Sequence, residues 1–230
     1  MEGMADGSNR RSSSIEDYVR AIYGLVERGE PVTNTSLAAR LEVSPSSASG
    51  MVTKLSQQGL VAHVPYRGIE LTPAGRQLAR SVLRRHRLIE SYLVSELGYT
   101  WDEVHSEADL LEHVVSDLLV ERIAAKLGNP VRDPHGDPIP AADGSVEELS
   151  TRLLDELPAG SVGEIVRVWD TDPDLLRYLA ERSITLGDRI EVVERQPFGG
   201  PVVVKVGPPA RAETHALGTE IAQALSVAVR

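Results

Sequence analysis

The segment EADLLEHVVSD, residues 107–117, carries two carboxylates and an imidazole at a spacing that could bind a metal ion. Asp109, Glu112 and His113 are three and four positions apart, so on an α-helix they would share one face. Carboxylates this close repel each other unless a positive charge lies between them. Asp17, in an earlier amphipathic segment, is a candidate fourth ligand. Clustered charges are more often a solvated helix face, so spacing alone leaves both interpretations open.

A second group of possible ligands precedes this segment. His86 and Glu90 are four residues apart, and His105 begins the next predicted helix. Because the chain has no cysteine, a metal site must use His, Asp and Glu, and disulfides and cysteine nucleophiles are excluded. The other three histidines lack acidic neighbours of this kind, and we expect them in surface or loop positions: His63, His135 and His215.

The charge distribution divides the chain into parts with different partners. The net charge is −10, but residues 1–85 carry +3, residues 86–160 carry −11 and residues 161–230 carry −2. A basic N-terminal part followed by an acidic central part indicates an anionic partner for the first and a bound cation for the second. The chain has neither a long apolar run nor an apolar signal sequence at its start. We therefore expect a cytoplasmic protein with no membrane partner.

The elements that position these groups follow from hydrophobic periodicity. Helices are expected over 12–29, 32–43 and 44–59, the third with Ser44 as N-cap and Pro45 at its first position. Two short strands with a turn at PYRG follow within 60–75. Three helices and a small hairpin are typical of a winged helix-turn-helix domain, expected over 1–73.

The middle of the chain is expected to be a helical dimerisation domain over 74–143. One long helix is predicted from Pro73 to about Leu97 and a second over roughly 102–127. Their apolar surface exceeds what one helix pair can cover, which indicates a homodimer. The segment 128–145 is rich in Pro, Gly and Asp and is expected to be a loop.

The last part of the chain is predicted to be a small, mostly β domain over 158–230, after a linker over 144–157. Strand patterns occur in GSVGEIVRVWD, DRIEVVERQ and PVVVKVG, with a short helix in PDLLRYLAE. The fold class expected for the whole chain is mainly α with a small β part. No nucleophile elbow or P-loop is present, so we expect no enzyme and no small-molecule substrate.

The segment 44–58 is the candidate DNA-reading helix, because small polar side chains fill a face that a packed helix would make apolar. With no Asn, Gln or Arg in 44–51, recognition would depend on van der Waals contact and DNA shape. A purely structural unit or a protein-binding unit is the alternative. The residues expected to contact double-stranded DNA are Ser44, Pro45, Ser46, Ser47, Ser49, Thr53, Lys54, Tyr66 and Arg67.

Ordered motifs across the chain carry a family resemblance. EDYVRAIYGL, VSPSSASGMVTKLSQQGLV, YRGIELTPAGRQLA, RRHRLIESYLVSELG and VHSEADLLEHVVSD resemble the diphtheria toxin repressor and manganese transport regulator family. The resemblance runs from about residue 14 to the end and implies a C-terminal SH3-like β-barrel. It also implies a metal-dependent repressor that binds palindromic operators of metal uptake and homeostasis genes as a dimer.

The resemblance also implies two metal sites. The primary site falls on Asp17, Asp109, Glu112 and His113, and the ancillary site falls on His86, Glu90 and His105 with Asp170. The other position that the resemblance implies for a ligand from the SH3-like domain is occupied by Arg167, which cannot bind a metal. Arg20 stands where the binuclear manganese regulators carry a glutamate, which favours two separate sites.

Ligand chemistry predicts the metal. Iron-type members of the family place a methionine and a cysteine where this chain has Asp17 and Asp109. Three carboxylates and an imidazole form a hard site suited to Mn(II), with Fe(II) second, and Zn(II) or Co(II) could substitute in vitro. An iron-dependent repressor and a manganese-dependent metallohydrolase are the alternative functions, together with a winged-helix regulator that needs no metal.

Overall fold

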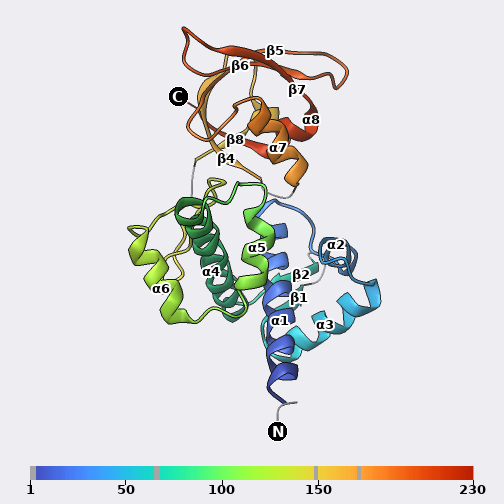
Figure 1. Cartoon of the computed structure of the whole chain (residues 1–230). Coiled ribbons are helices and arrows are strands. Elements are labelled where there is room, and N and C mark those ends of the chain that lie inside the picture. The colour runs from blue at the N-terminus through green and yellow to red at the C-terminus, as the bar shows by residue number, and fades with distance from the viewer. Residues whose placement is uncertain (1–3, 65–67, 148–149, 170–171, 230) are drawn as a thin grey trace. The chain divides into compact units, whose positions relative to one another are not determined.

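The computed structural model describes residues 4–64, 68–147, 150–169 and 172–229 (Figure 1). The chain forms two compact units. Unit 1 comprises Met1–His86 with Pro140–Ser145, and unit 2 comprises Arg87–Ile139 with Val146–Arg230. Among the residues described, no helix is long and apolar enough to cross a bilayer.

Unit 1 holds the winged helix-turn-helix that the sequence predicts. Helices α1 (Met4–Glu27), α2 (Asn34–Arg40) and α3 (Pro45–Gln57) precede strands β1 (Val61–Val64) and β2 (Gly68–Leu71). The strands pair antiparallel, with Val61 opposite Leu71 and His63 opposite Ile69. The core is a single apolar cluster whose fully buried side chains include Ile22, Leu37 and Leu55.

Local capping fixes the turn between α2 and α3. Thr33 caps α2 in a reciprocal arrangement with Ser36, and the Ser44 hydroxyl accepts a hydrogen bond of 3.1 Å from Ser47 N. Pro45 occupies the first turn, as predicted. The hairpin depends on Gly68, because a Cβ there would lie 2.6 Å from Val32 O at a φ of +83°.

The helices of unit 2 correct one sequence expectation. In place of a single helix over 102–127, the structure has α5 (Val104–Leu111) and α6 (Asp117–Lys126), separated by a turn. Ser116 has extended backbone geometry and caps α6 through a 3.3 Å hydrogen bond from Leu119 N. Glu112 is the C-cap of α5, and His113 lies in the turn. The stacking of three ligands on one regular helix, which the spacing predicted, is therefore wrong.

The long helix α4 (Pro73–Leu97) contributes its second half to unit 2, where Leu88, Ile89 and Leu93 pack against α5 and α6. Apolar side chains of α5, of the turn that follows it and of α6 remain exposed. Leu110 is 71% exposed, Val114 67%, Leu118 67% and Leu119 47%. A patch of this kind on a folded chain marks an interaction surface.

The C-terminal part of unit 2 is a six-stranded antiparallel sheet. Its spatial order is β3-β8-β4-β5-β6-β7, so within the described residues the ladder is open between β3 and β7. Leu176 and Leu179 of α7 and Ala222 of α8 join the buried core of the sheet. The strands are β3 (Arg152–Leu153), β4 (Val162–Val168), β5 (Arg189–Arg195), β6 (Val202–Val206), β7 (Glu213–Leu217) and β8 (Leu225–Val229), with η1 (Leu154–Glu156), α7 (Pro173–Glu181) and α8 (Thr219–Ala224) between them.

Candidate metal centre and DNA interface

The candidate DNA-reading face lies on α3 of unit 1. Lys54 of this helix is partly buried. The other six predicted contact residues of the segment are exposed, namely Ser44, Pro45, Ser46, Ser47, Ser49 and Thr53. The hydroxyl of Ser44 lies 2.9 Å from that of Ser46 and 2.8 Å from that of Ser47. Such a cluster can present hydroxyl groups to phosphates or base edges. Tyr66 and Arg67 lie outside the described residues.

Two predicted metal ligands, Asp17 and His86, belong to unit 1. Asp17 is partly buried on α1. His86 is buried on α4, and its Nδ1 lies 3.0 Å from Nη1 of Arg20. Because a guanidinium can only donate, Nδ1 accepts, and the ring proton of the neutral imidazole is then on Nε2. In this arrangement neither ring nitrogen of His86 offers a lone pair to a metal.

Five predicted ligands of unit 2 form pairs around α5. His105 Nδ1 lies 3.1 Å from Oε1 of the fully buried Glu90, and its Nε2 lies 3.8 Å from Oδ2 of Asp109. Glu112 is 0% exposed, and its Oε1 lies 3.4 Å from Nε2 of His113. A buried carboxylate requires compensating positive charge, which an imidazolium or a metal ion can provide. These donors therefore fit a divalent cation.

The structure also brings together a set that the sequence did not single out. Ligand atoms of Glu90, Asp133 and His135 lie within 4.8 Å of one another, and all three residues are buried. His135 lies in a loop, which is one of the two positions expected for it, but it is 0% exposed and has Asp133 as an acidic neighbour. Its Nε2 lies 2.8 Å from the carbonyl of Trp101, which can only accept, so the proton is on Nε2 and Nδ1 is the acceptor. A backbone carbonyl fixing the far nitrogen is typical of metal-binding histidines.

The loop that carries Asp133 and His135 is organised by its own carboxylates. Asp133 Oδ1 accepts hydrogen bonds of 2.9 Å from the backbone N–H groups of His135 and Asp137. Arg87 lies 3.5 Å from both Asp133 and Asp137. The loop is thus pre-formed, and Asp133 has a structural role whether or not it binds a metal.

Arg167 occupies one of the two positions that the resemblance implies for the SH3-like domain, but a guanidinium cannot bind a metal. It forms an ion pair with Asp137, and its guanidinium lies 3.5 Å from the centre of the Trp169 ring. Val168 N donates a 2.8 Å hydrogen bond to His135 O. Arg167 therefore contacts the metal-candidate loop through an ion pair. Asp170, the domain's predicted ligand, lies outside the described residues.

A second polar contact joins the helical part of unit 2 to α7. Arg177 Nη1 lies 3.3 Å from Oδ2 of Asp102. Burial alone would raise the pKa of the Asp102 carboxyl, but hydrogen bonds from Thr100 and Arg177 outweigh it and hold the pKa below its usual value. The pair therefore contributes to stability in the ionised form of Asp102.

Comparisons with known proteins agree with this arrangement. Three family models match the chain: "Iron dependent repressor, N-terminal DNA binding domain" over residues 11–69, "Iron dependent repressor, metal binding and dimerisation domain" over 72–141, and "FeoA domain" over 152–229. The iron-dependent repressor IdeR of Mycobacterium tuberculosis is 34% identical over 231 residues, covering 95% of this chain and 98% of that protein. The diphtheria toxin repressor of Corynebacterium diphtheriae is 33% identical, covering 79% and 85%.

Solved structures extend the similarity to three dimensions. A manganese-dependent transcriptional repressor in complex with manganese has a TM-score of 0.89 at 45% identity, covering 94% of this chain and 100% of that one. The manganese regulator SloR has a TM-score of 0.80 at 34% identity, covering 94% and 98%. These relatives are DNA-binding repressors, so the metallohydrolase alternative is set aside. The chain belongs to the diphtheria toxin repressor family and is a metal-dependent, DNA-binding transcriptional repressor with a dimerisation domain.

Proposed function

We propose that Mn(II) is the corepressor of this protein and that its operators control genes of metal uptake and homeostasis. The observation that carries the proposal is the buried Glu112 carboxylate, whose Oε1 lies 3.4 Å from Nε2 of His113, and the proposal adds Asp109 of α5, which the structure pairs with His105. Hard oxygen ligands suit Mn(II), whereas the iron-type pattern uses sulfur at positions 17 and 109. Fe(II) remains the second candidate, because curated relatives such as IdeR are named as iron-dependent.

The primary site of the proposal is Asp109, Glu112 and His113, with Asp17 added by the family resemblance alone. Bound Mn(II) would supply the positive charge that lets three carboxylates occupy one site. Without that charge, the carboxylates of such a site would repel one another. Asp17 therefore links the charge of the site to α1 and so to the DNA-reading unit. A corepressor acts in this way if it binds the DNA-competent state better than the other.

The ancillary site is proposed around Glu90. The resemblance implies His86, His105 and Asp170 as its partners, whereas the hydrogen bond from Arg20 disfavours His86 as a ligand. The donor atoms of Asp133 and His135 favour a site with Glu90 inside unit 2. We propose that Glu90 and His135 bind the ancillary ion, with Asp133 as the additional carboxylate.

The proposed repressor acts as a dimer on a two-fold symmetric operator in the cytoplasm, where the chromosome lies. In a two-fold complex the spacing of the two α3 helices must match the spacing of the half-sites. We propose that the exposed residues Leu110, Val114 and Leu118 belong to the dimer contact.

The test is a fluorescence-anisotropy titration of the protein onto the DNA upstream of its own gene. Parallel series contain chelator, Mn(II), Fe(II) under anaerobic conditions, or Zn(II), each at buffered free-metal concentration. We expect tight binding only with a divalent ion, at a free Mn(II) concentration that cells maintain. Binding that is equal in chelator would refute metal dependence of this chain, and activation by Fe(II) alone would replace Mn(II) with the second candidate.

A further inference from the structure

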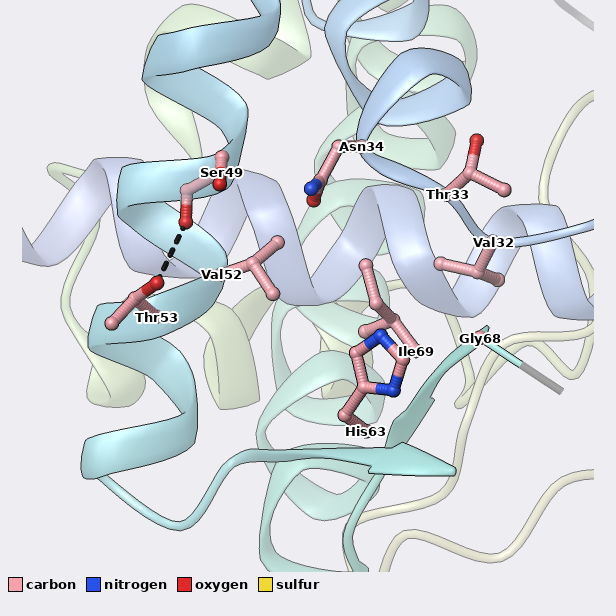
Figure 2. A pocket seen from close by; sticks show the side chains of 9 residues that line it. All are labelled: Val32, Thr33, Asn34, Ser49, Val52, Thr53, His63, Gly68 and Ile69. Atoms are coloured by element: carbon pink, nitrogen blue, oxygen red, sulfur yellow. Dashed lines mark hydrogen bonds between the residues drawn. The ribbon is translucent and has the colours of Figure 1, made fainter. Parts of the chain in front are cut away.

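The DNA-binding unit contains a pocket beside the reading helix that the predicted contacts do not explain. It has a volume of about 370 Å³ and is bounded by α2, α3 and the hairpin of β1 and β2 (Figure 2). Val32, Val52 and Ile69 form its apolar part. Its polar groups are the side chains of Thr33, Asn34, Ser49, Thr53 and His63.

Only some of these polar groups can donate a hydrogen bond into the pocket. The Thr33 hydroxyl belongs to the cap of α2, and the Thr53 hydroxyl donates to Ser49 O at 3.0 Å. Asn34, Ser49 and His63 remain, each exposed. Figure 2 shows the His63 imidazole reaching into the pocket from β1, with Asn34 entering from α2 and Ser49 from α3. Three donors from three elements around an apolar floor suit an anion attached to an apolar group.

The operator backbone is the occupant that fits these features. A nucleotide presents an apolar sugar face and an anionic phosphate, and most protein–DNA hydrogen bonds go to the backbone. Ser49 and Thr53 line both the pocket and the outer face of α3, so the pocket is continuous with the predicted reading surface. The N-terminal DNA-binding family model, over residues 11–69, includes every lining residue.

The charges around His63 favour an anion. Among the described residues of the elements that form the pocket, the charged groups are Arg40 on α2, Lys54 on α3 and Glu70 on β2, and none of them lines it. Glu70 pairs with Ala62, so alternation along the strands puts it on the other face of the hairpin from His63. Imidazole is the side chain that normally gains its charge between pH 5 and 8.

We propose that His63 is protonated in the operator complex and donates a hydrogen bond to a backbone phosphate seated in this pocket. Operator affinity at full metal occupancy then rises as the pH falls. This inference rests on the proposed function, since it requires that the metal-loaded protein bind operator DNA.

The test compares the wild type with His63→Gln, which keeps a hydrogen-bonding side chain without the charge. Operator dissociation constants are measured from pH 5.8 to 7.8 by anisotropy, at free Mn(II) raised until binding no longer changes. The ratio of the two constants at each pH removes the effect of pH on metal binding. We expect the variant to bind about as well as the wild type at pH 7.8 and about tenfold more weakly per half-site at pH 5.8, as for a charge-assisted hydrogen bond. Its salt slope at pH 5.8 should be smaller by about 1 per half-site.

Two further variants sharpen the outcome. His63→Lys should bind tightly at both pH values, because its charge does not titrate there. His215→Gln, on β7 of unit 2, should follow the wild type throughout. A ratio that is constant with pH, with operator binding intact, would overturn this inference alone. Failure of the wild type to bind operator with any Mn(II) concentration would overturn the proposed function as well.

Discussion

Replacement of Glu112 by glutamine tests the primary site with the least disturbance of packing. The side chain is 0% exposed and lies 3.4 Å from His113 through Oε1. Glutamine keeps the volume and an acceptor oxygen but removes the negative charge. We expect the metal-free protein to remain folded and dimeric, because burying a neutral amide costs less than burying a carboxylate.

The expected magnitude follows from the number of ligands. Loss of an outer contact to a metal ligand weakens metal affinity by about 10- to 100-fold, so loss of a charged direct ligand should weaken it by at least about 100-fold. At Mn(II) equal to 100 times the wild-type dissociation constant, binding stabilises the wild type by about 2.7 kcal/mol but the variant by only about 0.4 kcal/mol. For a protein of 230 residues these values correspond to rises in Tm of about 5–11 °C and about 1–2 °C.

The assay is calorimetric melting with and without Mn(II), beside operator binding at the same free metal concentration. Glu107→Gln is the matched control, since it makes the same substitution on α5 at a residue that is not among the proposed ligands. Any ancillary ion stabilises both variants equally, so the difference between them reports the primary site. A Tm rise in Glu112→Gln equal to that of Glu107→Gln, with metal-stimulated operator binding retained, would refute the assignment of Glu112.

The other predictions concern the metal, the ancillary site, the dimer and pH. Asp109→Cys should shift activation toward Zn(II) or Fe(II) in the anisotropy assay, and an unchanged metal profile would remove the argument from ligand hardness. His135→Ala should lower the Mn(II) stoichiometry in calorimetric titration by one ion per chain whereas His86→Ala should not, and the reverse result would favour the set implied by the resemblance. Leu118→Glu should convert the dimer to a monomer in sedimentation and reduce operator affinity at least tenfold, whereas Val131→Glu, also at an exposed position, should not. Because folding lowers the pKa of Asp102, its pair with Arg177 contributes fully above the ordinary aspartate pKa of about 3.9 and is lost below it, so Asp102→Asn should flatten the fall in unfolding free energy between pH 5 and 3.

Local signals in the sequence predict the DNA-binding unit well. The Ser44 cap, Pro45 and the apolar spacing of α1 to α3 act within a few residues, and the structure confirms each of them. The break between α5 and α6 also had a local signal, Ser116 followed by Asp117, which is typical of a helix start. The apolar periodicity is strong on both sides of this point, so the pattern as a whole predicted one continuous helix.

The burial of His135 had no such signal. Its environment is made by Trp101, 34 residues earlier, and by Val168, 33 residues later, so it depends on how the SH3-like part packs on the helices. A Pro-, Gly- and Asp-rich segment such as 133–138 is ordinarily a solvated loop. Here Asp133 accepts a hydrogen bond from the loop backbone, and Arg87 balances the charge of its carboxylate. The loop can therefore be buried. Only the tertiary contacts could show that Glu90 has Asp133 and His135 as neighbours.

The two proposed metal sites differ in what they can switch. Asp137 is paired with Arg87 and Arg167, and arginine keeps its charge at every physiological pH, so the loop that positions Asp133 and His135 is held whether or not a metal is bound. A pre-formed site binds its ion without rearrangement, and binding there cannot by itself change the population of two states. In the proposal, the primary site adds Asp17 of the DNA-binding unit to ligands of the helical part, so its occupancy would be linked to the arrangement of the reading helix. Repression by metal should therefore follow occupancy of the Glu112 site, and loss of the ancillary ligands should change the stability of the protein more than its response to metal.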